Sequence, residues 1–243
     1  MAMLDWLRTD PRTPPTIEVG DRVLPVVVRR LAHARRMTLR LAPDGSEVRL
    51  SIPRWGRAQE AIAFARTRIG WLERQLAALP AMQPPGHGAT IRFRGMALTI
   101  DHAPAGARTP RLGDGMIHVG GPAESLPARL RRWLEAEARA ACTADLAFYC
   151  ARIERVPPAL ALSNARRRWG SCAPDGAIRI NWRLIMAPDL VRRSVVAHEV
   201  AHLVHFDHSE RFHALLGDLF EGEVREANHW LKREGRLLYA TFG

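Results

Sequence analysis

Lysine, paired cysteines and long apolar runs are scarce in this sequence. Its longest apolar runs, such as residues 24–28, fall far short of the ~20 residues that span a bilayer, which excludes a membrane-spanning helix. The cysteines number three (Cys142, Cys150 and Cys172) and include no CxxC pair, so they do not form a disulfide framework. Residues 1–10 lack the apolar segment of a secretory signal. These absences favour a cytoplasmic protein with no membrane partner.

Positive charge is abundant, and arginine carries it. The formal net charge is +11, the sequence pI is about 11.1, and Lys232 is the only lysine. Such a field attracts anions, which makes nucleic acid, nucleotides and acidic substrates candidate partners. An arginine-rich composition spread over solvated faces explains the total equally well. Local clusters such as Arg166 to Arg168 are therefore more informative than the net charge.

The pattern of apolar residues predicts an α+β chain with a boundary near residue 125. Residues 1–125 are predicted to form a β-rich domain with one helix at about 56–79, which Pro80 ends. Its first strands are expected at residues 17–19, 23–28, 37–41 and 48–52, with an Asp44-Gly45 turn between the last two. Later strands are expected at 91–100 and 116–119. Strands and helices do not alternate regularly enough for a doubly wound sheet.

Residues 126–243 are predicted to be rich in helix. A long helix is expected at about 126–155, followed by a hairpin-like stretch that turns at residues 174–176 between 159–169 and 177–186. Apolar residues alternate with Arg179, Asn181 and Arg183, so this second strand is expected to bury one face and present a polar one. A helix opens at Pro188-Asp189, and a last helix is expected over residues 221–238.

The candidate metal motif lies in the helix that follows Pro188. His198 and His202 are four residues apart, which places both imidazoles on one helical face, able to bind one ion. Glu199 lies beside the first histidine, where it can take a proton from the water that the metal activates. Imidazole ligands favour Zn²⁺, although another divalent metal fits as well. The pattern predicts a metal-dependent hydrolase.

The third ligand is assigned by spacing. His208 lies six residues beyond His202, far enough for the chain to turn at the helix end and return to the metal. His205 is the competitor on the same helical stripe, but it lies a further ~4.5 Å along the axis at ~1.5 Å per residue. A carboxylate from the last helix is the other alternative, and the candidates there are Glu221, Glu223 and Glu226. Asp207 and His205 can instead orient a ligand imidazole.

These residues carry a resemblance to a known family. The segment from His198 to Ser209, followed by Phe212 and preceded by the Arg168-Trp-Gly-Ser-Cys172 motif, resembles the YgjP-like metallopeptidase-domain family, a relative of the SprT and WLM zincins. The segment 35–40, the strand 48–53 and Trp71 resemble its N-terminal half. The resemblance implies a zincin-like domain whose metal helix packs on a small antiparallel sheet, with His198, His202 and His208 as ligands and Glu199 as the catalytic residue. Asp207 and His213 depart from the family pattern.

The basic segment before the metal helix supplies candidate substrate-binding residues. Arg166 and Arg168 can bind phosphate or carboxylate in a bidentate manner, Trp169 can stack on a base, and Ser171 can donate a hydrogen bond. Trp169 can equally fill the core beneath the metal helix. Cys172 is either a further metal ligand or, as we expect, a buried thiol.

Three functions fit this sequence. The first is a zinc peptidase, in which the strand 177–186 holds an extended polypeptide by strand addition. The second is a pyrophosphatase acting on nucleoside triphosphates such as UTP, an activity that the resemblance also implies. The third is a nucleic-acid-associated protein with a structural zinc, which the carboxylate of Glu199 argues against. The sequence does not indicate an oligomeric state.

Overall fold

A computed structural model describes residues 15–42, 45–79 and 84–242. The chain forms two compact units, Met1–Pro80 and Ala81–Gly243. Among the described residues, no helix is both long and apolar enough to cross a membrane.

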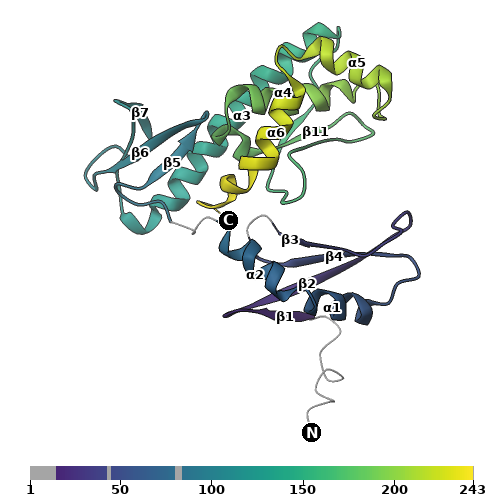
Figure 1. The fold of residues 1–243 in the computed structure, drawn as a ribbon. Helices are drawn as coiled ribbons and strands as arrows, with labels where there is room; N and C mark the ends of the chain where they lie inside the picture. The colour runs from purple at the N-terminus through teal and green to yellow at the C-terminus, as the bar shows by residue number, and fades with distance from the viewer. Residues whose placement is uncertain (1–14, 43–44, 80–83, 243) are drawn as a thin grey trace. The chain divides into compact units, whose positions relative to one another are not determined.

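The first unit packs two helices on one face of a four-stranded sheet (Figure 1). The order β1-β2-β4-β3 makes β2 and β4 parallel neighbours, whereas the other two pairs are antiparallel. The elements are β1 (Thr16–Val19), β2 (Arg22–Leu31), β3 (Thr38–Leu41), β4 (Val48–Pro53), α1 (Ala58–Arg66) and α2 (Ile69–Ala77). Alternate strand residues such as Val26, Leu50 and Ile52 are buried against Ala61 and Leu72 of the helices.

The four strands predicted in this unit are confirmed, but the single predicted helix is wrong. Two helices replace it, interrupted at Thr67 and Arg68. The Thr67 hydroxyl donates to the carbonyl of Phe64 at 2.8 Å, a local bond that competes with the helical ladder. In the predicted Asp44-Gly45 turn, Asp44 lies outside the described residues, and Gly45 adopts a φ of 69° that suits glycine.

The second unit begins with another four-stranded sheet, which shares its core with the longest helix. Its strands β5 (Thr90–Phe93), β6 (Met96–His102), β7 (Arg111–Gly113) and β8 (Met116–Val119) follow the order β5-β6-β8-β7. A short 3₁₀ turn, η2 (Ala123–Ser125), leads into α3 (Leu126–Arg152). The ring of Phe93 stacks on Trp133 of α3, with 4.9 Å between the centroids. This shared core explains why the chain divides after Pro80, whereas the sequence predicted a boundary near residue 125.

A three-stranded sheet follows α3 and is mixed, not antiparallel as predicted. Its strands are β9 (Leu160–Ser163), β10 (Gly170–Cys172) and β11 (Ile178–Asn181). The central strand β11 pairs antiparallel with β10 and parallel with β9. The predicted turn at 174–176 does join two antiparallel strands, but the first arm was placed wrongly: it is β10, whereas the strand within residues 159–169 is β9, which pairs in parallel on the other side of β11.

The polar face predicted for residues 177–186 is also wrong at two positions. The strand ends at Asn181, whose side chain accepts a hydrogen bond from the Arg183 amide and so opens the 3₁₀ segment η3 (Trp182–Met186). Asn181 and Arg183 are both fully buried. Arg183 donates to the Asn164 side chain and lies 4.5 Å from the ring centroids of Trp182 and Tyr239. Local alternation could not reveal that the core would supply polar and aromatic partners for these side chains.

The remaining helices surround the metal motif. They are α4 (Asp189–Ala201), α5 (Glu210–Leu219) and α6 (Val224–Glu234), with the 3₁₀ segment η4 (Gly235–Tyr239) after α6. Buried Arg192 anchors α4, because its guanidinium contacts the carboxylates of Asp145 on α3 and of Asp189. The helices predicted after Pro188 and near the C-terminus are confirmed, whereas α5 was not predicted.

Candidate metal centre

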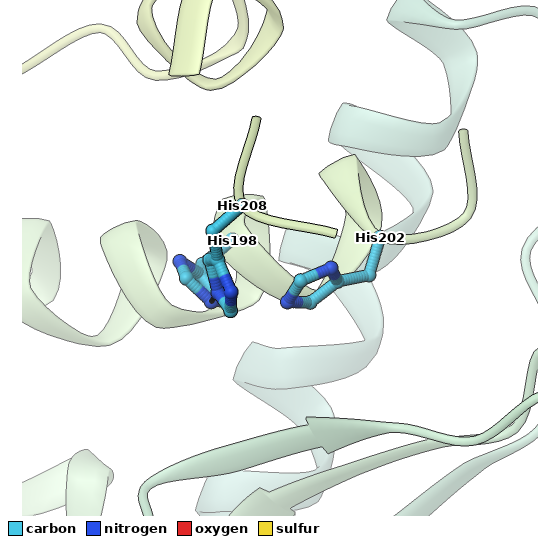
Figure 2. A group of neighbouring side chains, drawn as sticks. All are labelled: His198, His202 and His208. Atoms are coloured by element: carbon cyan, nitrogen blue, oxygen red, sulfur yellow. Dashed lines mark hydrogen bonds between the residues drawn. The ribbon is translucent and has the colours of Figure 1, made fainter. Parts of the chain in front are cut away.

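Three imidazoles converge where α4 ends. His198 lies in the last turn of α4, His202 is its C-cap, and His208 lies in the loop before α5. One ligating nitrogen of each comes within 4.8 Å of the others, and the Nε2 atoms of His198 and His208 are 3.2 Å apart. Figure 2 shows the ring of His202 directed toward the other two. The i, i+4 spacing and the returning loop thus bring together the three histidines that the sequence predicted.

The chain reverses after α4 through a short loop. The amides of Leu203, Val204 and His205 bond back to the last carbonyls of the helix, which ends it. Ser209 then caps α5 by accepting a hydrogen bond from the Phe212 amide. The Phe212 ring is fully buried, and its centroid lies 4.6–4.9 Å from those of the three imidazoles. The buried Phe212 ring therefore limits the positions that the three imidazole rings can adopt.

Among the described residues, the alternative third ligands do not belong to the histidine group. His205 contributes its backbone carbonyl, which lies 3.1 Å from the Nδ1 atom of His202. A hydrogen bond there places the Nδ1 proton on His202 and directs its Nε2 lone pair toward the other rings. Glu221 accepts from the hydroxyl of Tyr149 and pairs with Arg193. Glu223 and Glu226 do not join the histidine group within the described residues.

Glu199 is buried beside the histidines. Its side chain is only 6% exposed, and burial raises its pKa to about 7, against the opposing effects of Arg168 and the Cys172 amide. Burial and the neighbouring imidazoles lower the pKa of His198 to about 4, which keeps it neutral and able to bind a metal near pH 7. A carboxyl group with a pKa near 7 can both accept and release a proton at neutral pH.

Strand β10 contributes more to this site than the sequence indicated. A Cβ atom on Gly170 would lie 2.3 Å from Oε1 of Glu199, so the strand backbone and this carboxylate are in close approach. The bonds from the Asn181 amide to the Trp169 carbonyl and from the Ala173 amide to the Ala177 carbonyl fix the pairing with β11. The backbone groups of Gly170 and Cys172 consequently point to the free edge of the sheet.

The four predicted substrate-binding residues lie in different surroundings. Arg168 lies near enough to Glu199 to lower its pKa, and its side chain is exposed. Trp169 packs against Tyr239, with 5.6 Å between the ring centroids, as expected for a core residue. Ser171 directs its side chain to the face opposite Gly170 because successive strand residues alternate. Arg166 is partly buried.

The predicted strand addition at residues 177–186 is wrong. Strand β11 is hydrogen-bonded on both sides, so it cannot accept a further strand. The free edge beside Glu199 belongs to β10. Cys172 does not belong to the histidine group, and burial raises the pKa of its thiol. The thiol therefore remains protonated at neutral pH, although Cys172 is only partly buried and not the buried cysteine that was predicted.

The donor set fits a divalent metal. Imidazole nitrogens at ~2.0–2.1 Å from a tetrahedral zinc are about 3.3 Å apart, and the Nε2 atoms of His198 and His208 are 3.2 Å apart. Three protein ligands also match the number that catalytic zinc sites use. Fold and site together define a metal-dependent hydrolase.

The sequence profile described as YgjP-like, metallopeptidase domain matches residues 35–234. The chain therefore belongs to the YgjP-like metallopeptidase-domain family, as the motifs indicated. Neither a curated protein nor a solved structure matches it.

Proposed function

We propose that this chain is a zinc peptidase in which His198, His202 and His208 hold the metal and Glu199 is the general base. The observation that carries the proposal is the burial of Glu199, which follows His198 on α4, against the free edge of β10. A divalent metal held by the three imidazoles supplies a Lewis acid that polarises the attacking water and the peptide carbonyl.

The protein's own residues handle the proton. With a pKa of about 7, Glu199 can take a proton from the attacking water and deliver it to the departing amine nitrogen. The Cys172 amide and the Arg168 guanidinium favour the ionised carboxylate that must begin the reaction. A structural zinc site has no use for such a carboxylate, which argues against the structural interpretation.

Strand β10 suits an extended polypeptide. The amide and carbonyl of Gly170 and the carbonyl of Cys172 face the open edge, whereas the Cys172 amide is bonded to Glu199, so a substrate segment can pair with the remaining groups as an additional strand. Gly170 has no side chain to obstruct the substrate beside Glu199. This placement favours a peptide over a nucleoside triphosphate, although Arg168 provides a cation near the same site.

The test is the Glu199→Gln variant, assayed on an unfolded polypeptide after zinc loading. We expect hydrolysis to fall by at least about 100-fold, because the proton acceptor is lost, while zinc content stays at one per chain. The matched control is Glu226→Gln, which alters an exposed glutamate of α6 and should retain both activity and zinc.

Two outcomes contradict parts of the proposal. Full turnover by Glu199→Gln refutes the role of this carboxylate as general base. Pyrophosphate release from UTP by the wild-type protein, with no cleavage of polypeptide, refutes the peptide substrate and leaves the metal-dependent hydrolase in place.

A further inference from the structure

One end of the sheet in the first unit brings together two segments of chain. The parallel strands β2 and β4 end side by side, since Arg30 is paired with Ile52 and Leu31 with Pro53. Strand β3 begins at the same end, because Thr38 is paired with Ser51 of the antiparallel strand β4. The connection 32–37 between β2 and β3 and the residues that follow β4 are therefore neighbours, a placement that the sequence alone does not give.

The end of β2 and these two segments form the basic end of the sheet. It contains six exposed arginines, namely Arg29, Arg30, Arg35, Arg36, Arg54 and Arg57. Within the described ranges none of them forms an ion pair, although Arg30 donates to the carbonyl of Gly56 at 3.4 Å. Between Asp21 and Glu60 the only acidic residues are Asp44 and Glu47, in the stretch between β3 and β4, and Glu47 pairs with Arg49. Among the described residues, no carboxylate therefore forms an ion pair with the arginines at this end.

An aromatic ring accompanies this charge. Trp55 is 77% exposed and is held between Arg54 and Gly56 by a tight turn in which the Gly56 amide bonds to the Pro53 carbonyl. The side chain of His33, in the connection between β2 and β3, is also exposed. An exposed indole beside arginines offers a flat surface on which a base can stack while the guanidinium groups bind phosphates. A duplex keeps its bases stacked inside, so this combination fits a single strand.

We propose that the basic end of the sheet binds single-stranded nucleic acid, with its arginines on the phosphates and a base stacked on Trp55. An anionic lipid surface satisfies the arginines equally but gives the indole no stacking partner, so the observations favour the nucleic acid. This site belongs to the first unit and uses none of the residues assigned to hydrolysis. A test of this nucleic-acid site is therefore independent of a test of the proposed peptidase function.

The test uses the full chain and a fluorescein-labelled, mixed-sequence 20-nucleotide strand, as DNA and as RNA, in anisotropy titrations over a range of salt. Each lost phosphate contact lowers the steepness of log K against log salt by about 0.7. Arg35→Ala combined with Arg36→Ala should weaken binding by about 25-fold at 0.1 M salt and reduce the slope by about 1.4.

Two further sets of variants distinguish a specific binding site from general attraction of the strand by net charge. The matched control is Arg66→Ala with Arg74→Ala, which removes the same charge from exposed positions of α1 and α2 and should change affinity less than about threefold. Trp55→Ala should weaken binding by about tenfold with an unchanged salt slope, and Trp55→Phe should restore most of the loss.

Three results would overturn the proposal. The first is the absence of saturable binding to either strand. The second is an equal loss in the two double-arginine variants, which would mean that net charge alone attracts the strand. The third is binding to phosphatidylserine vesicles without binding to the oligonucleotides. Polypeptide hydrolysis measured on the same preparations tells a failure of this site apart from a failure of the hydrolase.

Discussion

The close approach of the Gly170 backbone to the Glu199 side chain predicts that Gly170→Ala impairs catalysis. The added Cβ would lie 2.3 Å from Oε1, 2.7 Å from Cγ and 2.8 Å from Cδ of Glu199. Ordinary van der Waals contact begins at 3.4 Å, so the carboxylate must move by about 1 Å. Because Glu199 is buried on α4, it has little room in which to make this shift.

The expected effect is large on catalysis and small on metal binding. A misplacement of about 1 Å in a reacting group costs about 100-fold in rate. The affinity for zinc should change less than about threefold, since the three atoms nearest to the new methyl group all belong to Glu199 and none to a ligand imidazole. Overpacking should also lower the free energy of unfolding by about 1–3 kcal/mol. In a Glu199→Ala background most of that loss should disappear, because the colliding side chain is gone.

The assay compares kcat on an unfolded polypeptide, bound zinc and urea denaturation for both backgrounds. Gly217→Ala is the matched control, because a Cβ at this helical position in α5 meets nothing within 4 Å. A Gly170→Ala variant with the wild-type kcat would refute the inference that β10 positions the catalytic carboxylate. A stability loss that persists in the Glu199→Ala background would place the collision elsewhere.

Three further predictions concern the ligands, the anchor of α4 and acid stability. His208→Ala should lose its zinc on dialysis, whereas His205→Ala should keep it, because that residue contributes only a backbone carbonyl. Asp145→Ala removes one of the two carboxylate partners of the buried Arg192 guanidinium, leaving Asp189, and should cost about 1–3 kcal/mol in urea denaturation. Without metal, acidification below pH 6.5 protonates the unfolded chain at His198 but not the folded one, whose pKa is about 4, so stability falls. The raised pKa of Glu199 has the opposite effect, because on acidification the folded chain takes up this proton before the unfolded chain does. Without that carboxyl group, the free energy of unfolding of Glu199→Gln should fall more steeply on acidification, by up to about 1 kcal/mol per pH unit.

The sequence predicted those parts of the site that depend on local geometry. His198, Glu199 and His202 follow from helical spacing, and His208 follows from the length of one loop. The contribution of Gly170 and Cys172 could not be predicted in this way. It depends on the register of β10 against β11 and on how α4 packs near that strand, and both are long-range contacts. A glycine next to Trp169 was visible in the sequence, but nothing local identified Glu199 as its neighbour.

The fold shows the same division between local and long-range information. Strands such as β4 were predicted because alternating residues reflect a half-buried sheet. The burial of Arg183 was not predictable, because it depends on Asn164 and Tyr239, which are distant in the sequence. The domain boundary was placed too late because β5 to β8 resemble the strands of the first unit. Only their packing on α3 assigns them to the second.

The buried carboxylate of Glu199 is costly, and that cost favours a catalytic role. Burial raises its pKa from 4.5 to about 7, which corresponds to about 3 kcal/mol against the ionised form. This is a large fraction of the ~5–15 kcal/mol that stabilises a whole domain. An apolar side chain at this position would pack without the penalty. A cation held by the adjacent imidazoles offsets part of the penalty, because opposite charge favours the carboxylate. The stability of this ionised group is therefore coupled to metal binding, as expected for a general base and not for a side chain that only fills space.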